Sequence, residues 1–297
     1  MPVEIPGDRA GRGSFTSGGD VRPEEERTLE SMRDALRHRD PRAAIRVATR
    51  VPPDRLGPDE LHLFMDTLLA AAAGLADGSD AELQAYDLVI RAGDLLSADD
   101  ILGPAIQLKM NSALFNMGVV LAQLGRTEEA IAAYDELVRR SGASPGQGLR
   151  DSAVRALFNK GASLVELERR EEAIAVYDEL VGRFADAEDP SVTVTIGKAL
   201  INKGIALAEL NRLAEAIAVL DDVASRWGDS PDPNLRERAA RALLNKASAL
   251  AHLRHQEMAL TTYEEILSRF GKDRDPIVRE HVALARETRD TLRQNLN

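Results

Sequence analysis

Asparagine recurs at a fixed interval in the second half of the chain, and its carboxamide is well suited to binding chemistry. Four residues stand 43 positions apart: Asn116, Asn159, Asn202 and Asn245. A carboxamide both donates and accepts hydrogen bonds, as a peptide unit does. Such a column predicts binding of an extended peptide backbone, with each bond contributing about 0.5–1.5 kcal/mol. The alternative interpretation is structural: the asparagines link neighbouring helices or merely reflect duplication.

Three cations form a second column, one helical turn before the asparagines and on the same face. They are Arg155, Lys198 and Arg241, with Ser112 at the matching place in the first copy. They make this face locally basic in a protein whose formal net charge is -11. A basic face favours an acidic peptide or a C-terminal carboxylate, bound through charge-assisted hydrogen bonds.

Apolar residues and lysines flank the asparagines in the same repeating positions. Phe115, Phe158, Ile201 and Leu244 come directly before them. We interpret these as an apolar floor, partly explained by core packing, whose exposed members would form pockets for partner side chains. Lys160, Lys203 and Lys246 follow the later asparagines. Their stems are expected to pack while each ammonium reaches an acidic residue on a facing helix.

Signals of catalysis are weak throughout the sequence. The chain has no cysteine, and its five histidines show no spacing typical of a metal site. No phosphate-binding Gly-Lys loop or nucleophile elbow is present. We therefore expect a non-enzyme without catalytic residues, metal or cofactor. An enzymatic function would require a site within residues 23–110 that no motif reveals.

Composition narrows the class of partner and the compartment. The net charge of -11 argues against nucleic acid, since phosphate neutralisation needs a dense basic surface. The longest apolar run, 68–76, is too short to span a bilayer. The N-terminal residues lack the basic and apolar regions of a signal peptide. We expect a cytoplasmic protein with a protein or peptide partner and no membrane association.

Helices repeated every 43 residues must position these columns. Asp-Pro pairs at 189–190, 232–233 and 275–276 mark helix starts, because Asp supplies a capping oxygen and Pro suits the first helical position. First helices are predicted over 190–210, 233–253 and 276–295, and second helices over 127–140, 170–184, 213–227 and 256–270. A fixed period of this length is typical of a solenoid, in which each unit buries its apolar face only by stacking.

Some individual residues are assigned roles within these helices. Tyr134, Tyr177 and Tyr263 are expected to be core aromatics between helices. Three glycines follow second helices, where a left-handed C-cap favours glycine: Gly142, Gly228 and Gly271.

The remaining chain is predicted to be less regular. Residues 1–22 are rich in Gly, Pro, Ser and charge and are expected to be disordered. Residues 23–110 are interpreted as a helical region of degenerate repeats, with helices over 23–37, from 41 to before 52, and over 58–76 and 79–96. Four repeats then occupy 111–282, and 283–297 are expected to form a capping helix, since the end of a stack needs a polar outer face.

The pattern resembles the tetratricopeptide repeat. Its signature W-x2-L-G-x2-Y, then A-x3-F, corresponds here to Leu157, Lys160, Gly161, Leu164, Ala173 and Tyr177. Departures are Leu for Trp, Lys for an apolar residue, and a period of 43 instead of the family's 34. This long-period layout is similar to kinesin light chain repeats and bacterial arrays.

The resemblance implies an all-α, right-handed solenoid of antiparallel helix pairs. It implies small residues where paired helices approach closely: Gly118, Gly161, Gly204 and Ala247. It also places the asparagine column on the concave groove, where some relatives hydrogen-bond an extended peptide. Glu166 and Glu209 are directed to the same groove, where they would neutralise the cations and leave only a salt-bridge ladder.

The function favoured by these features is that of a non-catalytic scaffold or adaptor that binds an extended, acidic peptide. Two alternatives remain open. One is a structural subunit that self-associates, or joins a larger assembly, through its convex face or ends. The other is a regulatory sensor that changes superhelical pitch when a peptide binds.

Overall fold

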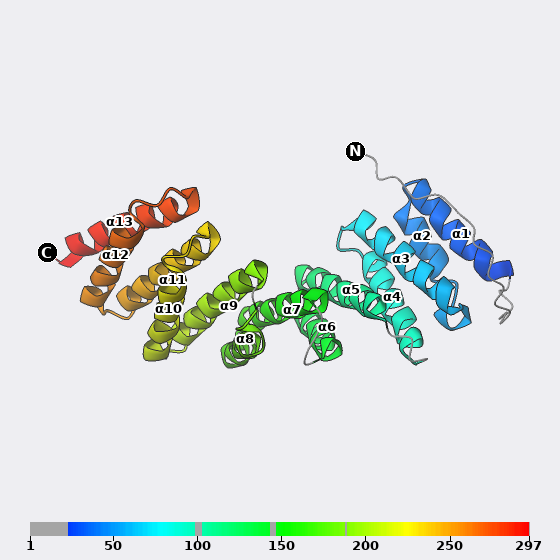
Figure 1. Cartoon of the computed structure of the whole chain (residues 1–297), viewed down its shortest axis with the longest axis horizontal. Helices are drawn as coiled ribbons and strands as arrows, with labels where there is room; N and C mark the ends of the chain where they lie inside the picture. The colour runs from blue at the N-terminus through cyan, green and yellow to red at the C-terminus, as the bar shows by residue number, and fades with distance from the viewer. Residues whose placement is uncertain (1–22, 99–102, 143–146, 188, 297) are drawn as a thin grey trace.

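The structure is a computed structural model that describes residues 23–98, 103–142, 147–187 and 189–296. All regular secondary structure in these residues is helical, and the helices follow one another along an open arch (Figure 1). The predicted all-α solenoid is confirmed. The disorder expected for residues 1–22 concerns a segment outside the described residues.

The helices of the N-terminal region begin and end close to the predicted positions. They are α1 (Pro23–Arg37), α2 (Pro41–Ala48), α3 (Pro58–Leu75) and α4 (Asp80–Ala98), with a 3-10 turn at Pro53–Arg55. α1 packs against α2, and α3 packs against α4, as antiparallel pairs do. This region therefore continues the paired architecture of the regular repeats.

Four further pairs and a last helix form the regular part of the stack. The first helices are α5 (Pro104–Gln123), α7 (Gln147–Glu166), α9 (Pro190–Glu209) and α11 (Pro233–His252). Their second helices are α6 (Thr127–Ser141), α8 (Arg170–Phe184), α10 (Leu213–Trp227) and α12 (Gln256–Phe270). The last helix, α13 (Pro276–Leu296), includes the residues expected to cap the stack.

First helices line the inner side of the arch. Each contacts the next one along the stack, from α5 to α7 and onward to α13. Figure 1 shows these helices along the upper, concave edge and α6, α8 and α10 along the lower edge. Residues that share a position in successive first helices therefore form rows along the stack.

Aspartates cap the first helices as predicted. The side chains of Asp189 and Asp232 accept hydrogen bonds from the backbone nitrogens of Ser191 and Asn234, both at 2.8 Å. Asp275 accepts in the same way from Ile277 N at 2.9 Å. These bonds satisfy amides that have no partner inside a helix, which explains why the period is marked by Asp-Pro.

The prediction of left-handed glycine caps is wrong for two of the three glycines. Gly228 and Gly271 have right-handed φ values of -60° and -59°. Gly228 lies beside the guanidinium of Arg269, whose Nη2 donates to the carbonyl of Ala224, and an added Cβ would lie 2.0 Å from that nitrogen. Left-handed residues instead occupy the turn between first and second helices: Gly125, Glu168, Asn211 and Arg254.

The glycine column permits close contact within each pair. An added Cβ at Gly118 or Gly161 would lie 2.5 or 2.4 Å from the ring of Tyr134 or Tyr177. Both tyrosines are buried, as is Tyr263, so their prediction as core aromatics is confirmed. In the pairs α5–α6 and α7–α8, a tyrosine of the second helix thus lies directly against the first helix.

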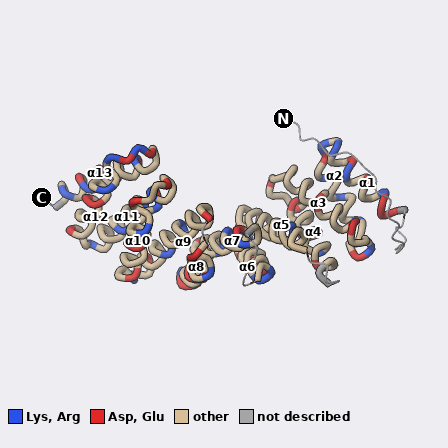
Figure 2. The backbone as a smooth tube through the Cα atoms, in the orientation of Figure 1, with Lys and Arg blue, Asp and Glu red and all other residues tan. Residues whose placement is uncertain are grey.

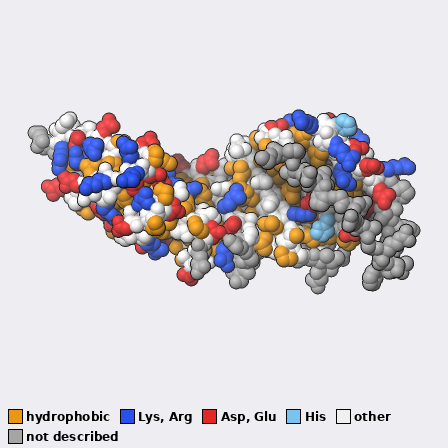
Figure 3. Space-filling model, turned by 45° about the horizontal axis from the view of Figure 1, so that its top comes forward, with side chains coloured by type: hydrophobic (Ala, Val, Ile, Leu, Met, Phe, Trp, Pro, Cys, Tyr) orange, Lys and Arg blue, Asp and Glu red, His pale blue; other side chains and the backbone are white. Residues whose placement is uncertain are grey.

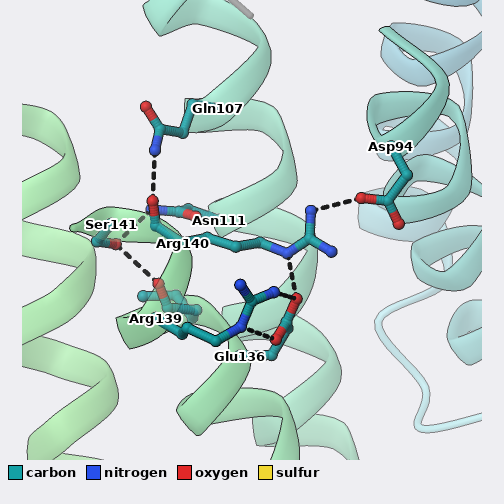
Figure 4. Close-up of polar contacts among 8 residues, drawn as sticks. Asp94, Gln107, Asn111, Glu136, Arg139, Arg140 and Ser141 are labelled. Atoms are coloured by element: carbon teal, nitrogen blue, oxygen red, sulfur yellow. Dashed lines mark hydrogen bonds and ion pairs between the residues drawn. The ribbon is translucent and has the colours of Figure 1, made fainter. Parts of the chain in front are cut away.

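A polar network ties α4 to the first regular pair (Figure 4). Arg140, at the end of α6, forms an ion pair with Asp94 of α4 at 2.6 Å and another with Glu136 at 2.5 Å. Gln107 of α5 donates to the backbone carbonyl of Arg140, and Asn111 donates to the hydroxyl of Ser141 at 2.8 Å. The N-terminal pairs and the regular repeats are therefore joined by directed bonds as well as by packing.

Candidate functional site

The asparagine column bridges neighbouring helix pairs. Asn159 Nδ2 donates to the hydroxyl of Tyr134 at 3.4 Å, and Asn202 Nδ2 donates to the hydroxyl of Tyr177 at 3.3 Å. Tyr86 of α4, the counterpart for Asn116, donates its hydroxyl to Glu82 Oε1 at 3.1 Å. The interpretation that these asparagines link neighbouring helices is confirmed for Asn159 and Asn202. Within the described residues, Oδ1 of Asn159 and Oδ1 of Asn202 have no hydrogen-bond donor.

The fourth asparagine has no such partner. The position that holds tyrosine in the other copies is Leu220, which has no hydroxyl. Asn245 Nδ2 is buried and lacks a hydrogen-bond partner among the described residues. An unpaired buried donor is costly, since it has lost water without gaining an acceptor. The ladder is therefore broken between α10 and α11.

Burial raises the pKa of the Tyr134 and Tyr177 phenols above the ordinary value, and the hydrogen bonds from Asn159 and Asn202 oppose that rise. Both phenols are therefore neutral around neutral pH. A neutral phenol oxygen accepts a hydrogen bond from the carboxamide NH2, and its own O–H remains able to donate one.

Lysines make a parallel set of links beside the asparagines. Lys160 and Lys203 form ion pairs with Asp135 and Asp178, each on the second helix of the preceding pair. Lys246 bonds Asp221 at 2.6 Å. The prediction that these ammonium groups reach acidic residues on facing helices is confirmed. Unlike the asparagine ladder, this row is complete across the junction that contains Leu220.

The cation column runs along successive first helices and is free of salt bridges within the described residues. No ion pair with a described residue is formed by Arg155, Lys198 or Arg241. The side chains of Arg155 and Arg241 are exposed. The expected neutralisation by Glu209 is wrong, because its carboxylate bonds Arg170 Nε at 2.6 Å instead. Glu166 is exposed and forms no ion pair within the described chain. Figure 2 shows how acidic and basic residues are otherwise interspersed along the helices.

The predicted apolar floor is largely closed. Phe115 is buried beneath the Arg155 guanidinium, whose central carbon lies 4.0 Å from the ring centroid. Phe158 is half-buried, and its ring lies 6.4 Å from that of Tyr177. The floor thus supports the cation and asparagine columns and offers less open apolar surface than its sequence suggests. Figure 3 shows hydrophobic side chains interspersed with charged ones on the side of the arch turned towards the viewer.

Sequence reasoning missed a pocket of about 490 Å³ at the broken rung. It is lined by Ile205 and Ala208 of α9, Leu220 of α10, and Asn245 and Ala249 of α11. Its volume lies within the range of about 300–1,000 Å³ typical of ligand pockets. The signal was present in the sequence, because Leu220 interrupts the tyrosine column.

The described residues contain no group of three or more His, Asp or Glu side chains placed to hold a metal ion. No helix in this part of the chain is long and apolar enough to cross a bilayer.

The solved structures that resemble this chain include helical-repeat proteins. The apo form of RapI is 12% identical, with 88% of this chain and 79% of that chain covered and a TM-score of 0.48. A Rap protein complexed with competence and sporulation factor is 12% identical, with 92% and 75% covered and a TM-score of 0.41. The TPR2AB domain of yeast Sti1, in a complex with pHSP90, is 16% identical, with 88% and 98% covered and a TM-score of 0.30. These likenesses are too distant to transfer a partner to this chain.

Comparisons of sequence are more specific about the family. No curated protein matches the chain significantly. Models of the tetratricopeptide repeat match residues 87–147, 155–187 and 201–275. Those segments make up more than half of the chain and include the asparagine, glycine and tyrosine columns. The chain therefore belongs to the tetratricopeptide-repeat family, whose members are generally non-catalytic interaction modules.

Proposed function

We propose that this protein is a non-catalytic scaffold that binds an extended, acidic segment of a protein partner along its concave face. The observation that carries the proposal is the row of Arg155, Lys198 and Arg241. These cations stand at equivalent positions on successive first helices and form no salt bridge within the described residues. Cations that form no salt bridge within the protein suit a ligand that supplies the carboxylates.

The asparagine ladder has a narrower role in this proposal than its sequence suggests. The NH2 groups of Asn159 and Asn202 already donate to tyrosine hydroxyls, whereas both Oδ1 atoms have no donor in the described chain. We propose that these oxygens accept hydrogen bonds from backbone N–H groups of the bound segment. In this proposal, each carboxamide nitrogen holds neighbouring helix pairs together, and each carboxamide oxygen binds the partner segment.

The bound segment would lie mainly within residues 111–282, which we propose as the recognition module. Here cations, carboxamides and half-buried Phe158 alternate along the inner helices. Residues 23–110 would lengthen the stack and anchor its first regular pair through the Arg140 network.

Fluorescence anisotropy with a labelled Glu-rich peptide tests the proposal. Arg155→Gln, Lys198→Gln and Arg241→Gln together should weaken binding at least about tenfold, since a hydrogen bond to a charged group contributes about 1.5–3 kcal/mol. The matched control combines Arg139→Gln, Arg183→Gln and Arg226→Gln, which remove three cations from second helices.

The control variant has the same net charge as the groove variant and should bind within about twofold of the wild type, because distant exposed charges are screened. A Gln-rich peptide of equal length should bind weakly to all three proteins. Equal losses of peptide affinity in both triple variants would show a general charge effect and would refute binding of the peptide by the cation column.

End-to-end self-association is the second candidate function. Ile277 and Leu284 of α13 are 54% and 52% exposed and lie two turns apart on one helix face. Light scattering over a wide concentration range would reveal assembly, and Ile277→Lys with Leu284→Lys should abolish it. The groove variant should leave such assembly unchanged.

A further inference from the structure

The broken rung between α10 and α11 combines an unpaired donor with an open pocket. Asn245 Nδ2 is buried without an acceptor in the described chain, and its side chain lines the pocket of about 490 Å³. At the two preceding junctions the equivalent nitrogen donates to a phenol oxygen, at 3.4 and 3.3 Å. The missing group at this junction is therefore a hydroxyl on an aromatic ring.

The surroundings of Leu220 retain features that accompany a ring elsewhere. Glycine is kept at Gly204, opposite Leu220, just as Gly118 and Gly161 face Tyr134 and Tyr177. Gly204, Leu220 and Asn245 all line the pocket. The open space therefore adjoins the position where a tyrosine would lie in the other copies.

The pocket wall selects among chemical groups. Ile205, Ala208 and Ala249 give an apolar surface that suits a ring. Glu209 also lines the pocket, and its carboxylate disfavours an acidic side chain but can accept a hydrogen bond from a phenol O–H. A purely aliphatic side chain would leave Asn245 without an acceptor.

We infer that this pocket binds the phenol of a tyrosine in the partner segment, which completes the asparagine–tyrosine ladder from outside. This inference rests on the proposed function and specifies its ligand: an acidic segment that contains a tyrosine opposite α10. The Asn245 carboxamide turns to present Nδ2 to the pocket, the phenol oxygen accepts from it, and the ring packs against Leu220 and its apolar neighbours.

The first experiment uses 4-methylphenol, which is the tyrosine side chain alone, and toluene, which lacks the hydroxyl. Saturation-transfer NMR should show 4-methylphenol bound to the full chain about three- to tenfold more tightly than toluene, the factor expected from one hydrogen bond. In 15N spectra the Asn245 side-chain NH2 signal should move on addition of 4-methylphenol. Equal binding of the two probes would overturn the inference.

Leu220→Tyr is the decisive variant, because it should fill the site from within. The retained Gly204 gives the new ring the same small neighbour that it has in the other copies. This variant should fold and should lose 4-methylphenol binding. Binding equal to that of the wild type would overturn the inference.

Asn245→Leu isolates the hydrogen bond from the pocket. It should abolish the preference for 4-methylphenol over toluene, whereas the matched variant Asn202→Leu, at a closed rung, should preserve that preference. Should Asn202→Leu remove the preference and Asn245→Leu keep it, the site would be misassigned.

Labelled acidic peptides with a central Tyr or Phe separate this inference from the groove proposal. On the wild type, we expect the Tyr peptide to bind about three- to tenfold more tightly than the Phe peptide. On Leu220→Tyr, we expect the two peptides to bind with equal affinity. Binding of 4-methylphenol without any peptide binding would refute the groove alone. Equal binding of both peptides to the wild type would refute the tyrosine pocket alone.

Discussion

The junctions from α8 to α9 and from α10 to α11 use the same repeat positions but reach different states. At the first, Tyr177 fills the space against Gly161 and accepts a hydrogen bond from Asn202. At the second, Leu220 faces Gly204, and Asn245 has no acceptor in the described chain. The lysine–aspartate link is present at both. One side-chain difference thus separates a closed junction from one that contains a pocket.

The contrast shows how a solenoid can combine uniform stacking with a local site. Cohesion is distributed over repeated contacts between neighbours, so one imperfect contact does not unfold the array. A pocket needs only one place where packing is incomplete and a polar group is left unpaired. The following predictions test whether Leu220 accounts for the difference.

The largest effect is expected for Tyr177→Ala, which removes the buried ring from the closed junction and leaves a cavity there. Tyr177 is fully buried, so the variant should lose about 3–5 kcal/mol of unfolding free energy. Urea denaturation followed by circular dichroism measures this loss. A loss below about 1 kcal/mol would contradict the placement of Tyr177 in the core.

Leu220→Tyr should close the open junction and raise the unfolding free energy by about 1–2 kcal/mol. The gain comes from a hydrogen bond to Asn245 and from the added buried ring surface. Urea midpoints of this variant and the wild type provide the measurement. A destabilised variant with an intact fold would mean that the space at this rung cannot take the ring.

Removal of the carboxamide should affect the two junctions unequally. Asn202→Ala should lose about 0.5–1.5 kcal/mol because it ends the bond to Tyr177, whereas Asn245→Ala should change stability by less than about 0.5 kcal/mol. In a Leu220→Tyr background, Asn245→Ala should become as costly as Asn202→Ala. Equal losses in the wild-type background would show that the two rungs do not differ.

The smallest effects are expected from the lysines, which are paired at both junctions. Lys203→Met and Lys246→Met should each lose about 0–1 kcal/mol, as is usual for ion pairs near the surface. Methionine occurs naturally at the matching position, Met117. Similar urea midpoints for the two variants would support Leu220 as the source of the contrast, and a large difference would point to another cause.

Much of the fold followed from the sequence because the helix signals are local. Asp-Pro caps gave the starts of α9, α11 and α13, and the period placed second helices within one or two residues of their observed ends. Glycines were harder to interpret. Gly228 follows a helix in a right-handed conformation and lies beside the guanidinium of Arg269, 41 residues further on. Local sequence cannot show such a neighbour.

The candidate site was predicted as columns but not as contacts. Asparagine and lysine recur visibly, yet their partners lie 25 residues earlier on another helix. Two columns meet only when neighbouring pairs pack at a particular angle and register. Glu209 illustrates the difficulty, because it bonds Arg170 rather than a cation of the concave row.

By itself, the sequence determined the helices, their period and their rows of equivalent residues, since capping, helical periodicity and duplication act along the chain. Tertiary structure alone decided which rows pair: carboxamide pairs with phenol and ammonium with carboxylate, whereas the cation column forms no ion pair in the described chain. It also turned a conservative-looking Leu220 into a pocket with an unpaired donor. The physical reason is that hydrogen bonds and close packing depend on distances between helices, which only the stacking of whole pairs fixes.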